Sequence, residues 1–189
     1  PPPPPPPPPS HMTRPPPRST LIRSRRQRQM CIRDRYRDKA IPEDLIEKIL
    51  KAGMNAPSAG NEQPWHFIVV DDREILDQIP KFHPHSKMLH EAPAAIVVCA
   101  DVANVKYPEY WPQDCSAATQ NILLAIADLD LGGVWLGVYP REDRVKKLQE
   151  LFRMPDDIIP FSIIALGHPA EQKPAKDIYD AQRVRRNRW

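Results

Sequence analysis

The sequence contains 189 residues, of which 41% are hydrophobic, enough for one folded domain with a buried core. The formal net charge of +3 is divided unevenly, because residues 1–35 carry +7 (eight Arg, one Asp) and residues 36–189 carry −4 (19 basic, 23 acidic side chains). The mildly acidic main part argues against a nucleic-acid-binding domain, and no apolar run reaches the roughly 18 residues that a membrane span requires.

Residues 1–35 differ in composition from everything that follows. Pro1–Pro9 is a polyproline run, Ser10-His11-Met12 resembles a cloning scar, and residues 25–35 have no clear apolar face. The head contains no apolar segment of the kind found in signal peptides. We interpret it as a disordered, non-native head translated from tag or adapter sequence. The alternative is a natural disordered basic arm.

The three cysteines give no sign of a metal centre or a disulfide framework. Cys31, Cys99 and Cys115 lie far apart in the sequence and form no recognisable spacing. This usage is typical of a reducing compartment, so we expect a cytoplasmic protein.

From Tyr36 to Trp189 the pattern is that of one globular domain. A helix is expected to begin at residues 41–44, where proline and acidic residues suit the first turn, and to end near Gly53–Pro57. Apolar runs predict strands at Trp65–Val70, Ala94–Ala100, Val134–Tyr139 and Phe161–Leu166. Further helices are expected at Arg73–Ile79, Pro112–Asp130 and Arg141–Phe152, with His83–Glu91 an ambiguous short helix. This alternation predicts a central sheet covered by helices.

The loop between the first helix and the first strand has the composition of a ligand-binding turn. Pro57 restricts its backbone, Ser58 and its two neighbours are small, and Asn61 and Gln63 each offer hydrogen-bond donors and an acceptor. A flat aromatic ligand with a polar edge needs this combination. The alternative is an ordinary loop in which the two amides satisfy nearby backbone groups.

Two later segments carry further candidates. The predicted long helix contains Asp114 and Cys115 followed by small residues, which favour close packing. We interpret Cys115 as a buried, inert thiol rather than a nucleophile. Gly137 interrupts a predicted strand, which indicates either a bulge or the close approach of a ligand to the backbone.

Other functional motifs are missing or weak. There is no G-x-G-x-x-G after a strand, and there is no P-loop, H-E-x-x-H or G-x-S-x-G. His83, His85 and His90 lack an obvious carboxylate or thiol partner, so we expect no metal site there.

Taken together, these segments resemble the FMN-dependent nitroreductase family over about residues 36–189. The loop reads A-P-S-x-x-N-x-Q-P-W-x-F at residues 56–67, and the long helix reads D-C-S-A-A-T-Q-N-I-L-L at 114–124. The motif G-V-W-L-G-V-Y-P at 133–140 and the closing G-H-P-A-E-Q-K-P-A-K and N-R-W are also similar to the family.

The resemblance implies a fold, a cofactor and an assembly. The fold is α+β, a three-layer α/β/α sandwich with a mixed central sheet. FMN lies at the interface of a homodimer. NADH or NADPH reduces it, and it then reduces a nitroaromatic, a quinone or a similar small molecule in a ping-pong cycle. The cofactor performs the hydride chemistry, so no catalytic side chain is expected.

Carried over position by position, the resemblance also implies site residues. Those around the flavin are Pro57, Ser58, Asn61, Gln63, Leu136 and Gly137, with Asp114 near the ring of the same or the partner subunit. Those near the phosphate are Lys173 and Lys176.

One family feature is missing. Members begin the domain with R-R-S-x-R before an aromatic residue, whereas residues 30–34 contain no R-R-S, and only Arg33 and Arg35 offer charge there. We therefore predict weak FMN retention. The alternatives within the fold are a flavin-binding protein with little turnover and a specialised member of the reductive dehalogenase or flavin-degrading type.

Overall fold

The computed structural model describes residues 35–171 and 179–189. At its centre is a five-stranded sheet in which β5 (Ile158–Pro169) pairs with β3 (Ala94–Asp101) and with β4 (Gly132–Gly137). Both partners align with the same stretch of β5, so they lie on opposite sides of it. β2 (Trp65–Val70) pairs with β3, and the short β1 (Tyr36–Arg37) pairs with the end of β5.

All the strand pairs within the described residues are antiparallel, which differs from the mixed sheet expected from the sequence. β3 and β4 both run opposite to β5 and therefore point the same way. Because β5 lies between them, they do not hydrogen-bond to each other. No parallel pair arises in this part of the chain.

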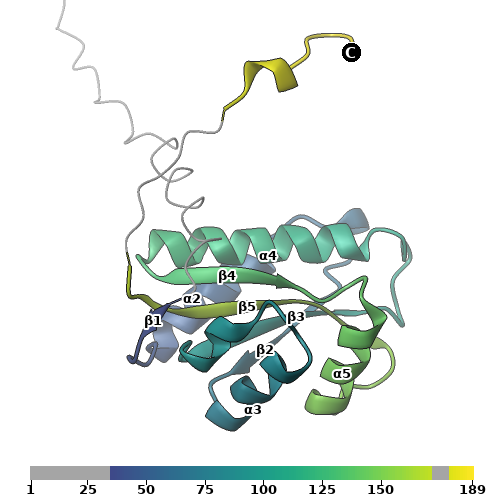
Figure 1. The fold of residues 1–189 in the computed structure, drawn as a ribbon. Coiled ribbons are helices and arrows are strands. Elements are labelled where there is room, and N and C mark those ends of the chain that lie inside the picture. Colours follow the sequence, from purple (N-terminus) through teal and green to yellow (C-terminus); the bar gives the residue numbers. More distant parts are fainter. Residues whose placement is uncertain (1–34, 172–178) are drawn as a thin grey trace, which may run out of the picture.

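Helices cover both faces of the sheet and give the expected three layers (Figure 1). One face packs against α2 (Glu43–Met54) and α4 (Trp111–Asp128), and the other against α3 (Arg73–Gln78) and α5 (Glu142–Phe152). β3 is buried on both faces, since alternate side chains of a strand point to opposite sides. Its residues accordingly divide between two separate hydrophobic clusters.

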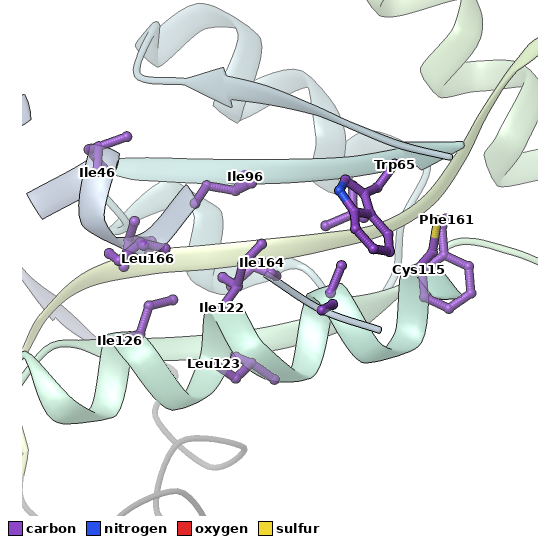
Figure 2. Close-up of a cluster of buried hydrophobic side chains, with 14 of the residues drawn as sticks. Ile46, Trp65, Ile96, Cys115, Ile122, Leu123, Ile126, Phe161, Ile164 and Leu166 are labelled. Carbon is purple, nitrogen blue, oxygen red and sulfur yellow. The ribbon is translucent and has the colours of Figure 1, made fainter. Parts of the chain in front are cut away.

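The core on the α4 face fixes this helix above β5. Ile122, Ile126 and Ile164 are fully buried, and Figure 2 shows them between the helix and the sheet. A buried polar contact lies in the same layer, where the hydroxyl oxygens of Thr119 and Ser162 are 3.0 Å apart. α4 is therefore fixed on β5 by apolar packing and by one polar contact.

The predicted elements are confirmed with small changes in their ends. The strand at Trp65–Val70 has the predicted bounds, whereas β5 begins three residues before and ends three residues after the predicted Phe161–Leu166. Pro160 obscured the start of β5. It is tolerated there because the register between β3 and β5 shifts opposite it, at Val98/Cys99. The later end reflects pairing with β1. The segment at 83–91 forms only η4, a 3₁₀ turn at Lys87–His90.

Candidate functional site

The loop that follows α2 is shaped by its own backbone. It contains a short 3₁₀ turn, η2 (Ala59–Asn61), and three residues with positive φ, namely Gly60 and Asn61 at 56° and Gln63 at 53°. The Ser58 hydroxyl accepts a hydrogen bond from the Gln63 N–H at 3.0 Å. Glycine and asparagine tolerate this left-handed conformation better than most residues. The motif therefore specifies a tight turn as well as a set of polar groups.

The amide side chains of Asn61 and Gln63 lie on the surface of this loop. Both residues are exposed, and neither side chain has a hydrogen-bond partner among the residues that the structure describes. The alternative in which these amides satisfy local backbone groups is therefore not what the structure shows. Their donors and acceptors remain available to a ligand.

Asp114 holds the loop through a hydrogen bond to its backbone. It lies in the first turn of α4, is 6% exposed, and accepts a hydrogen bond from the Ala59 N–H at 2.9 Å. The contact joins residues 55 positions apart in the sequence. Asp114 thus fixes the position of the loop through its backbone.

A second segment packs on the loop and was not predicted to do so. The Glu62 carboxylate accepts hydrogen bonds from the backbone N–H groups of Lys106 and Tyr107, the latter at 3.4 Å. The Tyr107 ring lies where a side chain on Gly60 would be, since a Cβ there would come within 2.7 Å of it. Glu62 stands inside the recognised motif at a variable position, so the motif gave no reason to select it.

Gly137, the last residue of β4, is unlike several other glycines of the chain. A Cβ built on Gly53, Gly60, Gly133 or Gly167 would lie within 3.1 Å of a side chain, so packing accounts for each of them. A Cβ on Gly137 would meet nothing within 4 Å, and its φ is not in the left-handed range. No neighbour in the described chain therefore requires glycine at this position.

The carbonyl oxygen of Gly137 is held by two side chains. His83 Nε2 lies 2.9 Å from it, and Arg144 Nη1 donates to it at 2.8 Å. Burial lowers the pKa of His83, the bond to Gly137 opposes that shift, and the charge of Arg144 adds to it. Neither residue was among the predicted site residues. His83 is 54 residues from Gly137 in the sequence, and Arg144, seven residues away, belongs to the predicted amphipathic helix and to none of the recognised motifs. Leu136, beside Gly137, is buried in the hydrophobic cluster.

The two groups of predicted residues lie at different places in one chain. The loop leads into β2, whereas Gly137 ends β4, and β3 and β5 lie between these strands. At about 4.8 Å between neighbouring strands, β2 and β4 are roughly 14 Å apart. The free amides and the open glycine of one chain therefore lie at or near the ends of strands that two other strands separate.

The remaining predicted residues contribute less to the described structure. Pro57 is exposed at the start of the loop. Arg35 is exposed and lies 3.9 Å from the Glu91 carboxylate. Arg33, Lys173 and Lys176 lie outside the described residues.

The buried cysteines are poor nucleophiles. Burial raises the pKa of Cys99 to about 12 and raises the pKa of Cys115 as well. The Cys115 thiol donates to the Cys99 carbonyl at 3.7 Å. A thiol with so high a pKa carries almost no thiolate near neutral pH, which supports the interpretation of Cys115 as inert.

The described ranges contain neither a cluster of metal ligands nor a helix that could span a membrane. No group of three or more His, Cys, Asp or Glu side chains is arranged there to hold a metal ion. His90 instead pairs with Asp77 at 2.8 Å. No helix in these ranges has both the length and the apolar character to cross a bilayer.

Comparison with known proteins shows which family has this fold and these motifs. The model of the nitroreductase family matches residues 22–85 and 80–168. A "Putative NADH dehydrogenase/NAD(P)H nitroreductase" of Methanothermobacter thermautotrophicus is 52% identical over 82% of this chain and 81% of its own length.

Two solved structures agree with this placement. A "Putative NADH Oxidase" of Clostridium acetobutylicum has a TM-score of 0.84 at 43% identity, over 88% of this chain and 99% of its own. An FMN-dependent nitroreductase of Clostridium difficile has a TM-score of 0.77 at 31% identity, over 83% of this chain and 94% of its own. With the family model matching most of the chain and relatives this similar, the chain belongs to the nitroreductase family.

Proposed function

We propose that this chain is a flavin oxidoreductase that binds FMN and uses NADH or NADPH as its electron donor. The observation that carries the proposal is the open backbone of Gly137, a glycine that no described neighbour explains. The names of the relatives point to the same chemistry, since one is called an NAD(P)H nitroreductase and another FMN-dependent.

The residues present fit a flavin. The edge of its ring carries both donors and acceptors, and the exposed amides of Asn61 and Gln63 supply the matching groups. Gly137 lets the ring approach the main chain without a Cβ in the way. Lys173 and Lys176, with Arg33 and Arg35, are the cations that we assign to the phosphate.

When bound, FMN supplies the hydride and electron transfer between the nicotinamide donor and a nitroaromatic or quinone acceptor, in a ping-pong cycle. The tasks of the chain itself are to bind, orient and tune the cofactor. The amides of Asn61 and Gln63 orient the ring by its polar edge. The Gly137 backbone lets the ring approach closely, and Asp114 fixes the loop that carries the two amides.

We further propose that the functional unit is a homodimer in which each flavin lies between two chains. The separation of roughly 14 Å between β2 and β4 supports this, because the loop leads into a strand at one edge of the sheet and Gly137 ends a strand beyond β5, towards the other edge. In a two-fold symmetric dimer, a site formed by the loop of one chain and Gly137 of the other occurs twice. Each half-site is then completed by the partner.

An FMN titration of the purified chain, followed by anaerobic addition of NADH or NADPH, tests the proposal. We expect saturable binding and bleaching of the flavin band at about 450 nm. In G137V, we expect FMN affinity to fall by about 1–3 kcal/mol, because the new side chain occupies the approach. Thermal unfolding of the variant should stay close to that of the unmodified chain, since a Cβ at this position has no atom of the described chain within 4 Å.

Two results contradict the proposal. One is the failure of the unmodified chain to bind FMN at any accessible concentration. The other is bound FMN that neither NADH nor NADPH reduces, which identifies a flavin-binding protein without turnover.

A further inference from the structure

The Gly137 carbonyl belongs to a strand edge that the sheet leaves uncovered. Within the described residues β4 pairs only with β5, and the Val138 N–H donates to the Phe161 carbonyl on β5. The C=O and the N–H of a trans peptide point in opposite directions. The Gly137 carbonyl therefore faces away from β5, where its oxygen meets His83 and Arg144.

The two donors come from different elements, and each is held independently. His83 follows the 3₁₀ turn η3 (Ile79–Lys81). Its N–H bonds to the Ile79 carbonyl at 3.0 Å, and its own carbonyl accepts the Ser86 hydroxyl at 2.8 Å. Arg144 lies in the first turn of α5. The carbonyl of Gly137 is thus fixed by two elements that pack on the same face of the sheet.

The contacts of the imidazole define its protonation. A carbonyl oxygen only accepts, so Nε2 must carry a hydrogen. Nδ1 is buried and has no hydrogen-bond partner among the described residues. A second proton there would be a buried donor without an acceptor, in a ring whose Nε2 lies 3.3 Å from Arg144 Nη1. His83 is therefore neutral, with its proton on Nε2, and it donates to the Gly137 carbonyl.

We propose that His83 and Arg144 are positioning residues of the flavin site, which hold the Gly137 peptide so that its open side is presented to the ring. The inference rests on the proposed function. It goes further in assigning a role to two side chains that do not belong to the recognised motifs. Loss of either donor frees a peptide that otherwise has one orientation, and loss of Arg144 also removes a positive charge close to the flavin.

Variants of His83 separate positioning from a general structural role. H83Q keeps an N–H donor near the place of Nε2, whereas H83L fills the same buried space without one. We expect H83L to raise the dissociation constant for FMN about tenfold, and H83Q to restore most of the loss. The matched control is H66Q, because His66 is exposed on β2 and contacts neither His83 nor Gly137. R144M should shift the midpoint potential of bound FMN to more negative values, with R144K closer to the unmodified chain.

Three readouts decide the outcome: FMN affinity from quenching of flavin fluorescence, the midpoint potential from spectroelectrochemistry, and deuterium exchange of residues 132–139 without FMN. Faster exchange in H83L together with weaker binding supports the proposal. If H83L and H83Q bind FMN as the unmodified chain does, or lose affinity equally, the positioning role is wrong while the proposed function stands. If the unmodified chain binds no FMN, both are wrong.

Discussion

At the scale of single residues, the site is defined as much by what is missing as by what is present. The described chain has room for a side chain at Gly137, although none is there. The side-chain amides of Asn61 and Gln63 have no hydrogen-bond partner within the described chain. Buried or crowded positions are explained by their neighbours. These three positions are not, and in a folded chain such positions are candidates for contact with a ligand.

Asp114 provides the residue-scale prediction. D114A leaves the Ala59 N–H without its acceptor, so the loop loses a fixed point, whereas D114N retains a carbonyl oxygen at the same place. We expect D114A to weaken FMN binding about tenfold and to speed deuterium exchange across residues 57–63. D114N should remain within about threefold of the unmodified chain. Equal loss in both variants would instead indicate that the charge of Asp114 matters.

At the scale of elements, α4 is tied to β5 by a polar contact with a definite direction. The Thr119 hydroxyl donates to the Cys115 carbonyl at 2.7 Å, and a hydroxyl has a single hydrogen. Ser162 is therefore the donor in the 3.0 Å contact between the two side chains. Both residues are fully buried, so a hydroxyl left without its acceptor is costly.

This direction predicts unequal effects of two conservative changes. T119V removes the acceptor and leaves the Ser162 O–H unsatisfied, so we expect a loss of about 1–3 kcal/mol in the free energy of unfolding. S162A leaves the bond of Thr119 to Cys115 intact and should cost less. The double variant should cost less than the sum, measured by urea unfolding. Equal costs for the two single variants would contradict the assigned direction.

At the scale of the whole molecule, two histidines link stability to pH. Burial is the main cause that lowers the pKa of His83 and of His168 below the ordinary value. As pH falls below about 6.5, the unfolded chain takes up protons that the folded chain binds less readily. The contribution of the two neutral histidines to the free energy of unfolding is therefore fully present above that pH. It decreases as the solution becomes more acidic.

Urea unfolding at pH 7.5 and pH 5.0 measures this linkage. We expect a lower urea midpoint at pH 5.0 than at pH 7.5. The difference should be smaller in H83Q, because glutamine does not titrate. The carboxyl group of Asp77 titrates in a separate, lower window, since the hydrogen bond from His90 lowers its pKa. An unchanged pH dependence in H83Q would show that His83 does not contribute.

The proposed homodimer makes a prediction about mixed subunits. A chain carrying N61A and Q63A damages only the loop half, and a chain carrying G137V damages only the other half. If each site takes one half from each chain, a heterodimer of the two has one intact site and one doubly damaged site. We expect native mass spectrometry of differently tagged heterodimers to find about one FMN per dimer, held as well as in the unmodified chain. Two weak sites and no recovery would place both halves in the same chain.

The sequence by itself determined the local features of this protein. Strand and helix periods placed β2, β3, α4 and α5 nearly at their observed bounds, because side-chain burial repeats with the local backbone geometry. The motif at residues 56–67 likewise identified the loop, since its proline, small residues and amides are adjacent in the chain.

Only the tertiary structure decided which distant groups meet. His83 and Gly137 are 54 residues apart, and Asp114 and Ala59 are 55 apart, so no local pattern links them. The antiparallel order of the sheet, the full length of β5 and the open space beside Gly137 likewise depend on packing between remote segments. Periodicity reports which side of an element is buried, whereas the partner against which it packs is settled by the folded chain as a whole.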